Sequence, residues 1–387
     1  MVTEQLDTSA RTEPEAPRLG TVRSLDGLRG LAIILVMLLH MGVLTPFPFT
    51  SFRPLERLAE SGFLGVDLFF VLSGFLITAL LLSEFGRNDR IRLVAFYRRR
   101  ALRLLPALAV LLATFVVYVL ITHLPRRPSF EAVLATALYV RNYVNVKVPP
   151  FTPVLGIGHL WSLSVEEQFY VVYPAVLFVL LRARRRWITP TVLFTLATLV
   201  ALRRAAVFSQ YRSSPAHLEQ LLNWTDVRAD GLVIGALAAW IWYRRTLTPR
   251  ATAVAGWLGA ATTIVILENA SETARWMYYG GWTLFNVAVA MVVLACATRS
   301  WRGAVVLEWA PLRLLGRVSY GLYLWHLLVF AIVARYLRYQ EGWSFAALLA
   351  VACAATAVLT AASFAIVERP ALRLKARLEA RDHQGVA

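Results

Sequence analysis

Long apolar runs dominate this sequence and restrict the folds that it can adopt. Backbone polar groups find no water inside a lipid bilayer, so a chain crosses it as helices whose hydrogen bonds are internal. With 58% hydrophobic and 16% charged residues, the composition is too apolar for an ordinary soluble protein. We therefore predict an all-α polytopic membrane helical bundle of about ten transmembrane helices. The segments of spanning length are 25–44, 61–83, 103–122, 163–182, 188–207, 227–243, 251–268, 281–298, 314–336 and 343–367.

Arginine is concentrated in alternate connectors between these segments. The positive-inside rule places such connectors in the cytoplasm, so both termini are predicted to be cytoplasmic. Topology thus accounts for the net charge of +17, and we do not expect nucleic-acid binding. The connector 123–158 is exceptional because it carries arginines on the predicted outer side. Within it, 130–146 is either a short re-entrant or interfacial helix or a further span. The Arg-rich regions are 84–103, 182–186, 244–250, 299–302 and the tail after Arg369.

The chain divides into three regions. Residues 1–22 are predicted to form a disordered cytoplasmic tail, 23–372 the membrane domain and 373–387 a cytoplasmic C-terminal tail. We find no internal repeat, and the polar N-terminal tail does not resemble a cleavable signal peptide. Cys296 and Cys353 lie in apolar runs, so we predict small buried side chains and not a disulfide or metal pair.

The first apolar segment carries a cation and an imidazole. Arg29 and His40 are about 16 Å apart along a helix axis and within about 20° of the same face. Ionisable side chains in a membrane usually face protein or water. The pair is therefore either functional or a helix-end anchor with a hydrogen-bonded interfacial histidine. The predicted orientation puts Arg29 toward the cytoplasm and His40 near the outer end.

Carboxylates lie at a similar predicted depth. Asp67, in the run Gly65–Phe75, either orients a histidine or marks a helix end at the interface. Glu166 and Glu167 open the fourth segment, and at least one of them should face a polar cavity. Ser73, a small residue within a spanning helix, is expected to serve packing and not to act as a nucleophile.

An arginine block precedes the third segment. Arg99 and Arg103 are four positions apart and Arg100 and Arg103 three, so several guanidinium groups can converge on one anion. A phosphate-bearing nucleotide is one interpretation. Topology or anionic lipid is the other.

Histidine also occurs near the middle of the ninth segment. His326 and Tyr323 are predicted to lie near mid-membrane, where a buried histidine that is hydrogen-bonded to a neighbour is the favoured interpretation. The six histidines show no metal-ligand spacing, so we predict no metal site.

Seven motifs follow one another along the chain: Arg29-x10-His40, Gly65–Phe75, Phe96–Pro106, His159–Tyr170 with its Glu-Glu-Gln-Phe-Tyr, Arg228–Gly235, Ser319–His326 and Glu368-Arg-Pro370. Taken in this order, they resemble the acyltransferase-3 family of integral membrane acyltransferases. The resemblance runs from about residue 23 to 372, and the ordered set is specific. Many relatives carry a fused extracytoplasmic hydrolase-like domain that we do not expect in this chain, so the resemblance does not assign the substrates of those fused members to it.

The resemblance implies transfer of an acyl group, commonly acetyl, from cytoplasmic acyl-CoA to a hydroxyl group. The acceptor would be an extracytoplasmic or membrane-associated carbohydrate or glycan, modified from the bacterial cytoplasmic membrane. Acyl-CoA, commonly acetyl-CoA, would be a co-substrate, and no cofactor would stay bound. Arg29 and His40 would form the family's catalytic signature. The acyl-CoA ligands would be Arg99, Arg100, Arg103 and Arg29.

The resemblance also suggests a mechanism. Neutral His40 would act as general base on the acceptor hydroxyl, which attacks the thioester directly. Asp67, or one of Glu166 and Glu167, would orient the ring. Arg29 would contact the CoA moiety or help to balance the charge in the channel. The rival is two-step transfer through an acyl-imidazole on His40.

Two other functions stay open. One is acylation of a soluble sugar-bearing metabolite or antibiotic. The preference for arginine over lysine is typical of high-GC genomes, in which either this acceptor or an envelope carbohydrate is expected. The other is secondary transport without acyl transfer. Many transporters are built from internal repeats, and we find none in this sequence. The sequence does not predict an oligomeric state.

Overall fold

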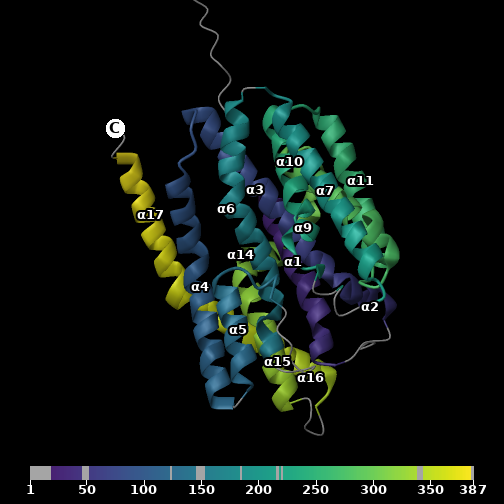
Figure 1. Ribbon diagram of the computed structural model, residues 1–387, viewed down its shortest axis with the longest axis vertical. Coiled ribbons are helices and arrows are strands. Elements are labelled where there is room, and N and C mark those ends of the chain that lie inside the picture. Colours follow the sequence, from purple (N-terminus) through teal and green to yellow (C-terminus); the bar gives the residue numbers. More distant parts are fainter. Residues whose placement is uncertain are drawn as a thin grey trace, which may run out of the picture.

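The computed structural model describes residues 19–45, 52–122, 124–144, 153–183, 185–214, 218, 221–337 and 343–384. Most of the tail predicted for 1–22 lies outside these ranges, as do residues 145–152 and 385–387. Within the described residues the regular elements are helices and none is a strand (Figure 1). The predicted all-α bundle is therefore confirmed.

The ten predicted segments correspond to ten helices. Nine stretches of the described chain are long and apolar enough to cross a membrane. The remaining segment, 227–243, forms a helix of 15 residues, shorter than the other nine and largely buried. The ten helices are α1 (Arg23–His40), α3 (Leu64–Asn88), α4 (Leu93–Thr122), α6 (Trp161–Arg182), α7 (Ile188–Tyr211), α10 (Asp230–Arg244), α11 (Pro249–Asn269), α12 (Trp282–Ala297), α15 (Ser319–Leu337) and α16 (Phe345–Ser363).

Shorter helices connect the long ones. Helix α5 ends at Ala137 after 12 residues, so a further span is wrong for the described part of 130–146. Helix α17 lies beside α4 and incorporates the predicted C-terminal tail as far as Gln384 (Figure 1). The α-helical connectors are α2 (Arg53–Glu60), α5 (Arg126–Ala137), α9 (Thr225–Arg228), α13 (Ala304–Leu307), α14 (Ala310–Arg317) and α17 (Arg369–Gln384). The 3-10 helices are η1 (Met41–Val43), η2 (Ser61–Phe63) and η3 (Pro153–Leu160), and the π-helical turns are η4 (Met277–Gly281) and η5 (Phe364–Glu368).

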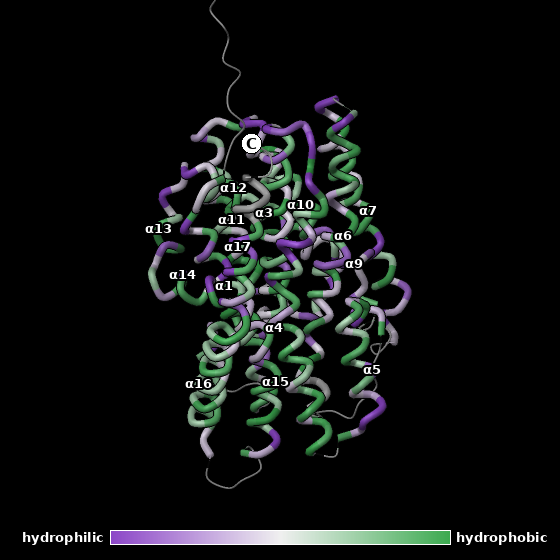
Figure 2. The backbone as a smooth tube through the Cα atoms, turned by 90° about the vertical axis from the view of Figure 1, so that its left-hand side faces the viewer, coloured by the Kyte–Doolittle hydropathy of each residue, from purple (hydrophilic) through white to green (hydrophobic). Residues whose placement is uncertain are grey.

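The outer helices expose large apolar side chains. Phe194 and Leu199 on α7, and Trp257 and Ile264 on α11, are each more than half exposed. Figure 2 shows hydrophobic residues along the length of the long helices. Continuous apolar surface of this kind needs a partner, and a lipid bilayer provides it. This exposed apolar surface and the nine candidate spans together indicate an integral membrane protein.

Helices α3 and α10 are in close backbone contact in the core. A Cβ atom at Gly74 would lie 1.9 Å from the backbone oxygen of Leu232, and one at Gly235 would lie 2.1 Å from that of Val71. Only glycine allows the two backbones to approach so closely. This contact brings the start of α10 against the start of α3, where Asp67 lies.

Helix α1 is held by a second close contact. A Cβ at Gly30 would lie 2.0 Å from the backbone oxygen of Leu312 in α14, so α14 packs directly on the first half of α1. Helix α15 begins two residues after α14 ends and runs beside α1. The chain thereby brings α15, with His326, to the end of α1 that carries His40.

Candidate active site

Arg29 and His40 both lie on α1 and are both partly buried, as expected for a helix face directed into protein. Arg29 forms a 3.7 Å ion pair with Asp26, one turn earlier. Arg103, Tyr170 and Glu166 are within electrostatic range of its guanidinium group. Arg29 is therefore the α1 member of a charged cluster between α1, α4 and α6.

The neighbours of His40 are two other histidines. Its Nδ1 lies 2.8 Å from the backbone oxygen of Val36 and 3.2 Å from Nε2 of His326. The ring centroid of His40 is 5.0 Å from that of His326 and 6.1 Å from that of His159. Three imidazoles from α1, η3 and α15 thus form one cluster. The sequence predicted His326 to be buried and hydrogen-bonded, which is confirmed, but not its contact with His40.

Backbone carbonyl groups fix the protonated nitrogen of each ring. A carbonyl oxygen only accepts hydrogen bonds, so a ring nitrogen within hydrogen-bond distance of it must carry the proton. His40 therefore donates from Nδ1 to Val36, which leaves its lone pair on Nε2. A neutral imidazole with an available lone pair is the usual general base in proteins.

Asp67 binds an arginine and not a histidine. Its Oδ2 accepts a 2.8 Å hydrogen bond from Nη2 of Arg228 and a 3.2 Å bond from Nε1 of Trp282. The carboxylate is fully buried. The expectation that Asp67 orients His40 is corrected, because a guanidinium group from the α9–α10 segment neutralises this carboxylate.

The two glutamates also have other partners. Glu167 makes a bidentate ion pair with Arg100, with distances of 2.6 and 2.9 Å from its Oε1 to Nη2 and Nε. The Arg100 guanidinium lies over the ring of Tyr170, 3.2 Å from its centroid. Glu166 accepts a 3.2 Å hydrogen bond from Ser73. The glutamates therefore belong to the charged cluster of Arg29, and the prediction that they orient His40 is corrected as well.

The arginine block is divided among different partners. Arg99 pairs with Glu84 at 3.8 Å, whereas Arg100 pairs with Glu167. Arg103 is within electrostatic range of Arg29. The expected convergence of Arg99, Arg100 and Arg103 on one anion is not observed. Arg99 and Arg100 are adjacent, so their side chains leave α4 about 100° apart and meet α3 and α6, respectively. A cavity of about 190 Å³ between α4 and α6 is lined by Tyr97, Arg100, Leu104, Tyr139, Glu167 and Tyr170, among others.

The sequence did not predict a second buried ion pair. Arg204 on α7 is fully buried and makes two hydrogen bonds, 2.9 and 2.8 Å long, to the carboxylate of Asp230. Thr283 donates to the same carboxylate at 2.9 Å. An arginine inside an apolar run was the available signal, since such a residue must face a partner within the bundle.

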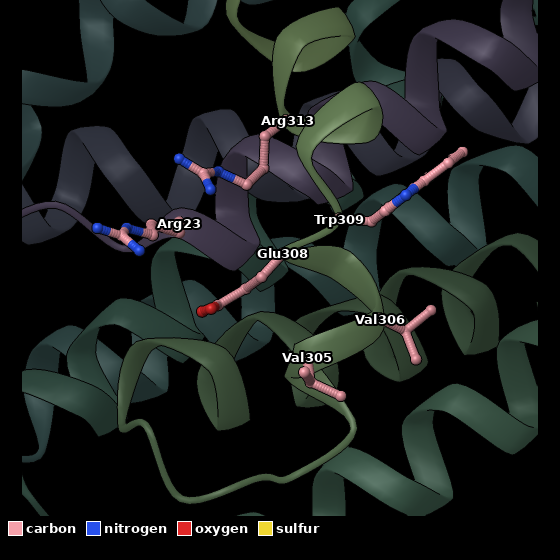
Figure 3. Close-up of a pocket in the computed structure, with 6 residues that line it drawn as sticks. All are labelled: Arg23, Val305, Val306, Glu308, Trp309 and Arg313. Carbon is pink, nitrogen blue, oxygen red and sulfur yellow. The ribbon is translucent and has the colours of Figure 1, made fainter.

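A wide, shallow pocket of about 570 Å³ lies elsewhere on the protein. Figure 3 shows Arg23, Glu308 and Arg313 on one side of it, with Val305, Val306 and Trp309 alongside. Arg23 opens α1 and His40 closes it, so the pocket lies roughly 25 Å along the helix from the histidine cluster. In the described part of the chain, no three His, Cys, Asp or Glu side chains are placed to hold a metal ion.

The fold, together with a family match over most of its length, defines this chain as an integral membrane acyltransferase domain. The model of the acyltransferase-3 family, described as an acyltransferase domain, matches residues 22–367. The chain belongs to this family.

Among its relatives is the O-acetyltransferase OatA of Staphylococcus aureus (strain NCTC 8325 / PS 47), which is 30% identical over 360 residues, covering 89% of this chain and 56% of the relative. The peptidoglycan O-acetyltransferase OatA of Listeria monocytogenes serovar 1/2a is 32% identical over 366 residues, covering 90% and 55%. The chain thus spans about half the length of these relatives. No solved structure gives a significant match to it.

Proposed function

We propose that this protein transfers an acetyl group from cytoplasmic acetyl-CoA to a hydroxyl group of a cell-wall carbohydrate. The reaction takes place in the bacterial cytoplasmic membrane, with the acceptor arriving from outside. The observation that carries the proposal is the state of His40, whose Nδ1 donates to Val36 and whose Nε2 holds the lone pair. The printed names of the relatives, O-acetyltransferase and peptidoglycan O-acetyltransferase, support the acetyl group and the acceptor class.

Arg29 and Arg103 are the proposed contacts of the donor. The two guanidinium groups are within electrostatic range and repel each other, and Asp26, 3.7 Å from Arg29, offsets only part of their charge. An anion bound by both is therefore favoured. The phosphate groups of coenzyme A supply such an anion. Arg99 and Arg100 are engaged with Glu84 and Glu167, so we assign them to holding α4 against α3 and α6.

His40 is the proposed general base. As the acceptor oxygen attacks the thioester carbonyl and forms the new C–O bond, Nε2 of His40 takes the hydroxyl proton. The tetrahedral intermediate then collapses, the C–S bond breaks, and the imidazolium returns the proton to the departing sulfur. The products are the O-acetylated acceptor and free CoA.

The test is an assay of the full chain in lipid nanodiscs with acetyl-CoA and fragments of peptidoglycan glycan. We expect release of free CoA thiol, and an acetyl mass added to the glycan, only when donor and acceptor are both present. His40→Ala is expected to reduce this activity by about 10²–10⁴-fold. Full activity of His40→Ala contradicts the role of His40.

Other outcomes identify the alternatives. An acetylated His40 trapped without acceptor supports the two-step route through an acyl-imidazole. Activity on soluble sugar-bearing metabolites but not on glycan changes the acceptor. Absence of CoA release with every acceptor contradicts acyl transfer and favours a transporter.

A further inference from the structure

His326 stands in the place where the sequence suggested a carboxylate beside His40. Its Nε2 lies 3.2 Å from Nδ1 of His40, across the contact between α15 and α1. The residue is fully buried, so its ring is held by protein contacts. The two rings meet edge to face at an interplanar angle of 60°.

The direction of this hydrogen bond follows from the carbonyl groups around His326. Nδ1 of His326 lies 2.8 Å from the backbone oxygen of Tyr323 and 3.0 Å from that of Leu322. Nδ1 must therefore carry the proton, and Nε2 of His326 holds a lone pair. The proton on Nδ1 of His40 points between two acceptors, the carbonyl of Val36 and the lone pair of His326.

Tyr323 holds the arrangement together. Its backbone oxygen also accepts a 2.7 Å hydrogen bond from Nε2 of His159, so one carbonyl fixes the tautomers of two imidazoles. Its phenol group donates a 2.8 Å bond to the backbone oxygen of His159 and contacts Ser162 at 2.5 Å. The cluster is thus rigid on the side of α15 and η3.

We propose that His326 is the positioning residue of His40. In histidine-dependent acyl transfer a third group, often a carboxylate, accepts a hydrogen bond from the second ring nitrogen and so orients the first. Here a neutral imidazole fills that role. When Nε2 of His40 takes the proton of the acceptor hydroxyl, the resulting imidazolium donates from Nδ1 more strongly, and Nε2 of His326 stabilises it. This inference rests on the proposed function of His40 as the base.

The charged groups near the cluster lie on other elements. Arg141, in the connector after α5, is within electrostatic range of His159, and Glu166 on α6 is within that of Tyr323. Phe330, one turn after His326, meets its ring edge to face with centroids 6.0 Å apart. Phe330 therefore offers a packing control that does not touch the hydrogen bond between the two rings.

The test compares His326→Phe, which removes the acceptor atom, with His326→Gln, whose amide oxygen can accept a hydrogen bond from Nδ1 of His40. We expect His326→Phe to lower kcat roughly 10- to 100-fold, below the 10²–10⁴-fold attributed to a general base, with the KM for acetyl-CoA unchanged. His326→Gln should recover part of the loss. The acid limb of the kcat profile should move to lower pH in His326→Phe, because the imidazolium of His40 has lost an acceptor. Phe330→Leu should keep the wild-type pH profile.

The outcomes separate this inference from the proposed function. If His40→Ala is inactive while His326→Phe keeps the wild-type kcat and pH profile, the positioning role is overturned and the function of His40 stands. If His40→Ala is fully active, the role of His40 as the base fails and the positioning role fails with it. Absence of CoA release by the wild-type protein with every acceptor would instead contradict the proposed function itself. Should His326→Phe not fold, His326→Met takes its place as the variant with no strong acceptor. Equal activity of His326→Met and His326→Gln then contradicts the inference.

Discussion

Nη2 of Arg228 lies 2.8 Å from Oδ2 of Asp67, and both side chains are buried where the start of α10 meets α3. The pair explains why the Gly65–Phe75 and Arg228–Gly235 motifs occur together. It commits the carboxylate of Asp67 to a structural contact at the core of the bundle. The ring of His40 is consequently oriented by another partner.

The Asp67–Arg228 pair should be important for stability. We expect Asp67→Asn to lower the free energy of unfolding by about 3–5 kcal/mol, because the Arg228 guanidinium is left buried without a counter-charge. Asp67→Leu combined with Arg228→Met should lose less than the sum of the two single changes. Thermal unfolding in detergent, followed by tryptophan fluorescence, measures both.

The exposed pair Arg127–Glu131, 3.0 Å apart, is the matched control. Arg127→Ala should change stability by roughly 0–1 kcal/mol, because water screens an exposed pair. If Asp67→Asn is as stable as Arg127→Ala, the buried pair does not have the structural role assigned to it.

Gly74→Ala tests the close approach of α3 and α10. The new Cβ would lie 1.9 Å from the backbone oxygen of Leu232, so the helices must separate. We expect a loss of roughly 1–3 kcal/mol, as for other overpacked cores. Gly158→Ala, whose Cβ would have no neighbour within 4 Å, is the control for stability and should melt close to the wild type. Equal melting temperatures for the two variants would refute the tight contact.

Donor binding should distinguish the arginines of α4. We expect Arg103→Ala to raise the KM for acetyl-CoA roughly 10- to 100-fold, which is the factor expected from the loss of one hydrogen bond to a charged group. Arg100→Ala should instead lower the melting temperature, because it leaves Glu167 unpaired. Arg87→Ala removes the same charge from the end of α3, where Nε of Arg87 donates to the backbone oxygen of Ser83, and serves as the control. A larger KM effect from Arg100→Ala than from Arg103→Ala would reverse the assignment.

Ser73 should be dispensable for the chemistry. Its hydroxyl donates to Glu166 at 3.2 Å, so it acts as a hydrogen-bond donor within the charged cluster. We expect Ser73→Ala to keep activity within about tenfold of the wild type, the loss of one modest hydrogen bond. Initial rates of CoA release measure the effect. Loss of activity as large as that of His40→Ala would point to a covalent role for Ser73.

Much of the fold was predictable because its signals are local. Segment length and hydropathy identified all ten helices, and helical periodicity placed Arg29 and His40 on one buried face of α1. The exception in length is α10, with 15 residues, because it is surrounded by other helices and lies against α3, α7 and α12. A helix that is surrounded by protein does not have to match the thickness of the bilayer.

The sequence by itself therefore determined the class of fold, the candidate base and the family. Only the tertiary structure decided the partners. His40 and His326 are 286 positions apart, and they meet only because distant segments pack together, as α1 and α14 do where Gly30 contacts Leu312. Position in the sequence predicts depth along a helix, and periodicity predicts which residues share a face, but neither predicts which neighbouring helix that face meets. A buried carboxylate pairs with the cation that packing brings to it, so Asp67 binds Arg228 and leaves His40 to His326.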